Sequence, residues 1–153
     1  MLFSGMSRVL SMLKRKSGWE SILNDHLEKH LNLKRDWGTV DCCMFTCDWV
    51  FNSTGEDPAK DFRGTYKTKS GAYKRIKAVA TDLPQLAYKI FSKLGMKEVN
   101  KFKAKRGDVG LVPGNGGLAL GVIDMTGRTI AVQGKEGLDF MPVENIIKAW
   151  GVN

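Results

Sequence analysis

In the first part of the chain, hydrophobic positions recur at helical spacing. Between residues 18 and 32, apolar side chains return every three or four positions, which predicts an amphipathic helix. Asp41 stands where an N-cap residue stands, directly before a mostly apolar segment, and Gly55 can take the left-handed conformation that ends a helix. Asp82 can cap a further helix with Pro84 in its first turn. The pattern predicts helices over residues 18–32, 42–51, 70–79 and 83–94.

After Gly95 the period of the hydrophobic pattern changes from 3.6 to 2, which predicts strands. Turn residues separate them, including the loop at residues 113–117 with its three glycines. Pro142 is predicted to open a closing helix that runs through Ala149. Helices followed by a strand meander indicate an α+β protein with an antiparallel sheet, not a parallel nucleotide-binding fold. The strands are predicted over residues 109–112, 118–123, 129–133 and 138–141.

Length and composition fit one globular domain. The chain has 153 residues, of which 42% are hydrophobic, and no apolar run approaches the roughly 18–20 residues of a membrane-spanning helix. The three cysteines fall within residues 42–47, a clustering that favours a reducing compartment over a disulfide framework. Residues 1–16 place their basic side chains after apolar ones, the reverse of a signal peptide. We therefore expect cytoplasmic synthesis.

The net charge of +8 is unevenly distributed. Residues 60–79 carry seven basic residues and one acidic residue, as do residues 89–106, whereas 17–59 and 107–153 are net acidic. Aromatic residues lie among the basic ones, as in some proteins that bind single-stranded nucleic acid. Because no helix-turn-helix, RNA-recognition or OB-type signature accompanies them, we expect a contact surface for other proteins or a solvated face, and no nucleic-acid partner.

Cys42 is the candidate nucleophile. A cysteine in the first turn of a helix faces free backbone N–H groups and the positive end of the helix dipole, and both favour the thiolate. The alternative is that Cys42 is a small core residue, as free cysteine usually is. Cys43 and Cys47, one turn apart, are expected to pack.

The two histidines, His26 and His30, lie one turn apart on the first predicted helix. That spacing can bind a metal, but no third ligand with matching spacing follows, so we expect helix packing, no metal and no cofactor.

Short motifs along the chain resemble those of the NlpC-type papain-like cysteine peptidases, and more closely an uncharacterised branch of that superfamily in phage and prophage tail gene clusters. The resemblance covers about residues 19–150. It is carried by Trp37-Gly38-Thr39-Val40-Asp41-Cys42-Cys43, Thr54-Gly55-Glu56-Asp57-Pro58, Arg63-Gly64-Thr65-Tyr66-Lys67-Thr68, Gly107-Asp108-Val109, Ala119-Leu120-Gly121-Val122 and Ala149-Trp150.

The resemblance implies a papain-like, NlpC-type α+β fold over residues 18–153. In that fold, N-terminal helices, one of which starts with the cysteine, pack on a C-terminal antiparallel sheet. Residues 1–17 would form a basic N-terminal arm outside it.

The resemblance also assigns the catalytic positions, residue by residue. The nucleophile position falls on Cys42, and the histidine position falls on Ala119, which cannot accept a proton. The orienting position falls near Ala131 or Gln133, of which only Gln133 is polar. His30 or His26 could replace the missing base in a permuted arrangement if the first helix lay beside the start of the second.

These departures favour a structural component of a phage or phage-like tail tip or baseplate, with a catalytically degenerate peptidase fold. Its expected partners are other tail and baseplate proteins, with peptidoglycan as a further candidate, and its expected location is the virion. The alternative is an active cysteine hydrolase, a peptidoglycan endopeptidase or amidase, with Cys42 as nucleophile.

Overall fold

The computed structural model describes residues 13–152 and has an α+β architecture, as predicted. Most of the predicted arm, residues 1–12, lies outside the described residues. The helices are α2 (Trp19–His30), α3 (Cys42–Thr54), α4 (Lys69–Val79) and α5 (Leu83–Leu94). The strands are β1 (Lys97–Val99), β2 (Val109–Gly114), β3 (Gly117–Ile123), β4 (Thr129–Gln133), β5 (Leu138–Pro142) and β6 (Lys148–Gly151). No helix within residues 13–152 is long and apolar enough to cross a membrane.

Side-chain caps start three of these helices. Asp41 accepts a hydrogen bond from the Met44 N–H at α3, Thr68 from the Gly71 N–H at α4, and Asp82 from the Gln85 N–H at α5. These caps satisfy backbone donors that a helix leaves free in its first turn. Gly55 ends α3 with a φ of 86°. The caps predicted at Asp41 and Asp82 and the helix end predicted at Gly55 are therefore confirmed.

All neighbouring strands of the sheet are antiparallel, in the order β1-β6-β2-β3-β4-β5. β2 and β3 pair along their whole length, from Val109 opposite Val122 to Gly114 opposite Gly117. β3 and β4 pair only at Val122–Ala131 and Ile123–Ile130. The first half of β3 therefore has no partner on its β4 side, which leaves an opening in the sheet.

The predicted closing helix over residues 142–149 is wrong. A 3₁₀-helix at Val143–Asn145 is followed by β6, which lies between β1 and β2. The strand is favoured because Ala149 and Trp150 point to opposite faces of the sheet and both are fully buried. β6 also covers the edge of β2, whose backbone groups would otherwise lack partners. The short strand β1 was not predicted, because its Lys-Glu-Val sequence has no apolar alternation.

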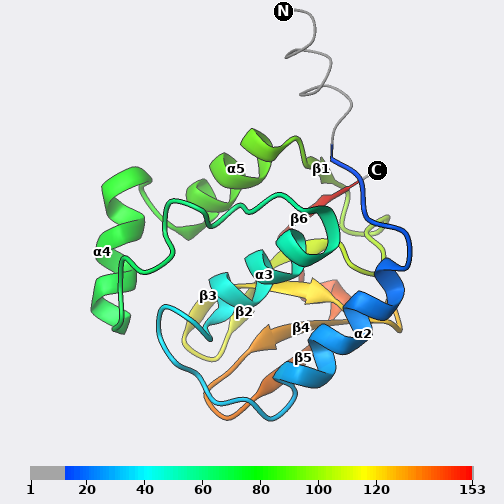
Figure 1. Cartoon of the computed structure of the whole chain (residues 1–153), viewed down its shortest axis with the longest axis horizontal. Helices are drawn as coiled ribbons and strands as arrows, with labels where there is room; N and C mark the ends of the chain where they lie inside the picture. Colours follow the sequence, from blue (N-terminus) through cyan, green and yellow to red (C-terminus); the bar gives the residue numbers. More distant parts are fainter. Residues whose placement is uncertain (1–12, 153) are drawn as a thin grey trace, which may run out of the picture.

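The core lies between the helices and one face of the sheet. Figure 1 shows α2 and α3 lying over the sheet, while α4 lies at the left edge of the molecule. Trp49 of α3 is fully buried, and its indole N–H donates to the Gly107 carbonyl at 2.7 Å. A second apolar cluster covers the opposite face of the sheet. The central buried residues on the helix side include Leu23, Phe45, Trp49, Phe91, Leu111, Leu120, Val122 and Trp150.

The described part of the predicted arm, residues 13–17, packs against the domain. Leu13 is buried in the core, and the Arg15 guanidinium pairs with Asp108 at 2.9 Å. The Lys16 N–H donates to the Ser53 carbonyl at the end of α3. These contacts attach the segment before α2 to both α3 and the start of β2.

Candidate functional site

Cys42 is the first residue of α3, at the end held by Asp41. One carboxylate oxygen of Asp41 accepts from the Met44 N–H at 2.8 Å, and the other accepts from the Gly38 N–H at 2.9 Å. Gly38 has a φ of 95°, and a Cβ there would collide with the Tyr66 carbonyl, so the loop before the helix needs glycine at this position. This arrangement holds Cys42 at the positive end of the α3 dipole.

Cys42 is partly exposed in a cleft of about 350 Å³. The cleft lies between the start of α3, one side of α4, the first half of α5 and the β2–β3 hairpin, with the end of β4 closing it. Its lining includes Cys42, Cys43, Met44 and Cys47 from α3, Ala72, Tyr73 and Ile76 from α4, Leu86 and Ile90 from α5, and Leu118, Ala119 and Gln133 from the sheet.

The thiol groups of the neighbouring Cys42 and Cys43 differ in acidity. The pKa of Cys42 lies below its ordinary value, because the Cys43 thiol donates a hydrogen bond to its sulfur and the Leu120 backbone N–H donates another. Burial and the Asp41 carboxylate act against this shift. The same hydrogen bond to Cys42, together with burial, raises the pKa of Cys43. Burial also raises the pKa of Cys47. Cys42 is therefore the thiol that ionises most readily, as expected for a nucleophile.

Ala119 lies in the wall of the same cleft, near the start of β3. Its side chain belongs to an apolar cluster against which Cys42 packs. The position to which the resemblance assigns a catalytic histidine thus lines the same cleft as Cys42, and it carries a methyl group. This side chain cannot take a proton from the thiol.

Neither histidine lines the cleft. The imidazole of His26 stacks on Phe45 with centroids 4.8 Å apart, and its Nε2–H donates to the Phe45 carbonyl at 2.8 Å. His30 meets the same phenyl ring edge-on, and its Nδ1–H donates to the His26 carbonyl at 2.9 Å. Burial lowers the pKa of His26 to about 4, with the neighbouring His30 as a further cause.

α2 therefore does lie beside α3, as the permuted arrangement requires, but the histidines fill the contact between the two helices. The structure does not bring His26 or His30 to Cys42 in the cleft. Their role is the helix packing expected from the sequence.

Gln133, the candidate orienting residue, is at the end of β4 and lines the cleft. Its side chain is buried, and its Nε2 donates to the carbonyls of Leu33 and Gly134 at 2.8 and 3.1 Å. Its Oε1 accepts no hydrogen bond within residues 13–152. A buried acceptor without a donor is costly, and this oxygen has almost no exposed surface although Gln133 lines the cleft.

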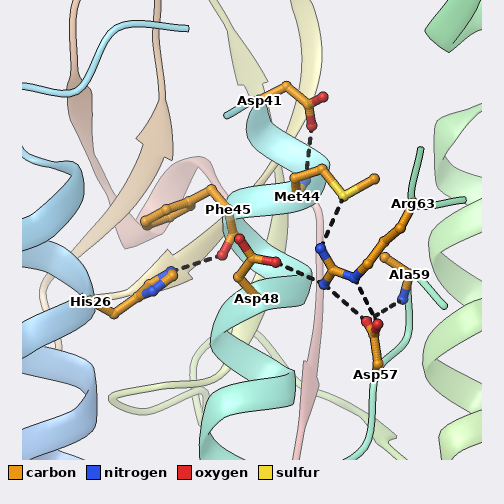
Figure 2. Close-up of polar contacts among 8 residues, drawn as sticks. All are labelled: His26, Asp41, Met44, Phe45, Asp48, Asp57, Ala59 and Arg63. Carbon is orange, nitrogen blue, oxygen red and sulfur yellow. Dashed lines mark hydrogen bonds and ion pairs between the residues drawn. The ribbon is translucent and has the colours of Figure 1, made fainter. Parts of the chain in front are cut away.

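Two further interactions support the cleft and were not predicted. The Tyr66 hydroxyl donates to Asp41 at 2.7 Å. Arg63 lies between two carboxylates, at 2.7 Å from Asp48 and 2.7 Å from Asp57, as Figure 2 shows. Two of the motifs on which the resemblance rests contain three of these residues: Asp57 lies in Thr54–Pro58, and Arg63 and Tyr66 lie in Arg63–Thr68. The motifs pointed to these residues but did not reveal that Arg63 and Asp57 hold the loop after α3 in place.

Within residues 13–152 no group of three or more His, Cys, Asp or Glu side chains comes together as a metal site. The residues that line the cleft are instead mostly apolar, with a single activated thiol.

The fold and the cleft define an α+β protein with a cysteine at a helix N-terminus facing an antiparallel sheet. The chain belongs to the family described as "Domain of unknown function (DUF6950)", whose model matches residues 14–152. No curated protein matches the chain.

Proposed function

We propose that this protein is a structural component of a phage or phage-like tail tip or baseplate, built on an NlpC-type, papain-like fold that no longer hydrolyses peptides. The observation that carries the loss of catalysis is the composition of the cleft. Cys42 and Ala119 line the same cleft, and both histidines of the chain are packed against Phe45. Losing general acid–base catalysis costs typically 10²–10⁴ in rate.

The tail assignment rests on the order of motifs between Trp37 and Trp150, which resembles that of the tail-associated branch. The tail assignment is also compatible with the contacts that the motif residues make in the structure. Asp57 and Arg63 pair with each other, Thr68 caps α4, and Tyr66 binds Asp41. These roles preserve a cleft-bearing scaffold and need no chemistry. On this proposal, the cleft holds a neighbouring chain in the assembly, and the protein is part of the virion.

Two measurements test the proposal. The purified protein is incubated with isolated cell-wall sacculi beside its Cys42→Ala variant, and released muropeptides are quantified. We expect no release from either. Muropeptide release by the natural protein that Cys42→Ala abolishes would overturn the loss of catalysis. The tail role is tested in a phage or prophage that encodes the protein: deletion of its gene should stop tail assembly, and the protein should be found in purified tails.

An active cysteine hydrolase is the second candidate, and one observation favours it. The pKa of Cys42 lies below its ordinary value because of the hydrogen bonds from Cys43 and Leu120, and the thiol is partly exposed in the cleft. A thiolate formed in this way attacks electrophiles without a neighbouring base. The sacculus experiment separates this candidate from the first, since only a hydrolase gives Cys42-dependent turnover.

A further inference from the structure

The apolar side of helix α4 is not fully covered by the rest of the protein. None of its residues is buried, although Ala72, Tyr73 and Ile76 form an apolar stripe that lines the cleft. The helix is held at its ends and flank by polar contacts. Thr68 caps it, Arg75 donates to Thr65 Oγ1 and to the Asp61 carbonyl, and Lys89 donates to the Val79 carbonyl. An amphipathic helix gains most of its stability by burying its apolar side, and here that side lines the cleft and is only partly buried.

The same region carries an unbalanced positive charge. Of the basic residues in 60–79, Arg63 is neutralised by Asp48 and Asp57. The remaining lysines are exposed, and none forms an ion pair with a carboxylate in the described part of the chain. These are Lys60, Lys67, Lys69, Lys74 and Lys77.

The opposite wall offers groups that match a polypeptide. The first half of β3 has no partner on its β4 side, and Leu118 there is 44% exposed. A peptide backbone supplies both N–H donors and carbonyl acceptors to such a strand edge, whereas a DNA backbone supplies only acceptors.

We propose that α4 and the cleft beneath it form a docking site for an acidic segment of a neighbouring protein. Apolar side chains of that segment fill the space between the stripe of α4 and β3, and its carboxylates lie against the lysines of α4. This docking site rests on the proposed structural function, in which the cleft holds a neighbouring chain. It specifies the chemistry of that chain.

The test uses the purified full chain and a synthetic peptide of alternating leucine and glutamate, with binding measured by calorimetry. Two control peptides replace every leucine by serine or every glutamate by lysine. Lys69→Glu combined with Lys77→Glu reverses the charge at the two ends of the stripe. The matched control, Lys97→Glu combined with Lys103→Glu, reverses two exposed lysines outside residues 60–79. Ala72→Trp fills the cleft and leaves the lysines in place. Circular dichroism establishes that each variant is folded.

We expect the leucine–glutamate peptide to bind and both control peptides to bind much more weakly. The α4 double variant should weaken binding about tenfold, since each reversed surface charge both loses an attraction and adds a repulsion. The control double variant should bind like the natural chain, and Ala72→Trp should weaken binding as strongly as the α4 variant. Equal effects of the two double variants would overturn the site on α4, as would unchanged binding by Ala72→Trp.

If the leucine–glutamate peptide does not bind, the proposal is overturned. This holds whether the protein binds duplex DNA instead, associates with a second copy of the chain, or binds neither. The result is independent of the sacculus assay. A protein that binds the peptide and also releases muropeptides refutes the loss of catalysis but not the docking site. A protein that does neither refutes the docking site alone.

Discussion

Tyr66 donates its hydroxyl to Asp41 at 2.7 Å and thereby joins the segment before α4 to the first turn of α3. The Asp41 carboxylate is buried and also accepts the backbone N–H groups of Met44 and Gly38. Three separate parts of the chain therefore meet on one side chain, directly before Cys42. Burial, and after it the Asp41 carboxylate, raise the pKa of Tyr66, so the phenol remains a donor.

Removing this donor should loosen the Cys42 end of α3. Tyr66→Phe leaves the ring in place and deletes the hydrogen bond to a charged acceptor, for a loss of about 2 kcal/mol in the free energy of unfolding. Urea denaturation measures the loss. Tyr73→Phe is the matched control, because the Tyr73 side chain is 49% exposed. Equal stability of the two variants would contradict the role of the Tyr66–Asp41 contact.

Much of the fold could be predicted because local signals agreed with the final packing. Asp41, Gly55 and Asp82 occupy the capping positions that their residue types favour. The helix predicted after Pro142 was wrong because long-range contacts decide the structure of this segment. Its strand β6 exists because β2 offers an open edge and the two sheet faces accept Ala149 and Trp150, and no local pattern contains that information.

The features of the candidate site also divide into those that local sequence predicts and those that depend on long-range contacts. Cys42 could be found because a helix start is a local feature, and Ala119 because the motif order assigns it a position. The place of the histidines depends on how α2 rotates against α3, and their contact with Phe45 is long-range. The roles of Tyr66 and α4 depend on a loop that folds back over the start of α3, which is equally long-range.

Cys42 should be the thiol that alkylates first. Its pKa is lowered by the Cys43 hydrogen bond and the Leu120 N–H, so the pH midpoint for iodoacetamide modification should lie below that of a free cysteine measured in the same way. Cys43→Ala removes the largest cause and should raise this midpoint, while Cys47→Ala should leave it unchanged. Mass spectrometry of digested protein identifies the modified residue. A midpoint at or above that of free cysteine contradicts the acidity of Cys42.

Placing a base at position 119, in the same cleft as Cys42, should increase the reactivity of the thiol further. Ala119→His puts an imidazole in the wall against which Cys42 packs, where its protonated form stabilises the thiolate. We expect the alkylation rate at neutral pH to rise about tenfold, which corresponds to about one pKa unit. Ala119→Gln is the control of similar size that accepts no proton. If both variants alkylate at the same rate, position 119 does not face the thiol.

His26 should make the stability of the protein depend on pH. Burial holds the pKa of His26 at about 4, against about 6.5 in the unfolded chain. Between these values the unfolded chain takes up a proton that the native protein does not, so the free energy of unfolding falls as the pH drops through this window. Above pH 6.5 the contribution is fully present, and over the window it amounts to about 3 kcal/mol.

The comparison with His26→Gln isolates this effect. The amide of the variant can still donate to the Phe45 carbonyl but does not titrate. Burial raises the pKa of Asp108 and of Asp48, which acts in the opposite direction near the acidic end, and these residues are present in both proteins. Urea denaturation at a series of pH values should give a steeper slope for the natural chain. Parallel slopes would show that His26 does not stay neutral.

The ion pair between Arg15 and Asp108 should be a major attachment of the segment before α2. Both side chains are almost fully buried, and the guanidinium also donates to the Arg106 carbonyl and stacks over Trp19. Arg15→Met removes the cation that pairs directly with the buried Asp108, a change that costs about 3 kcal/mol of unfolding free energy at neutral pH. Adding Asp108→Asn removes the orphaned charge and should restore part of the loss. Lys14→Met, at an exposed neighbouring position, should change stability by no more than about 0.5 kcal/mol. If Arg15→Met is no less stable than Lys14→Met, the segment is held by Leu13 and backbone contacts instead.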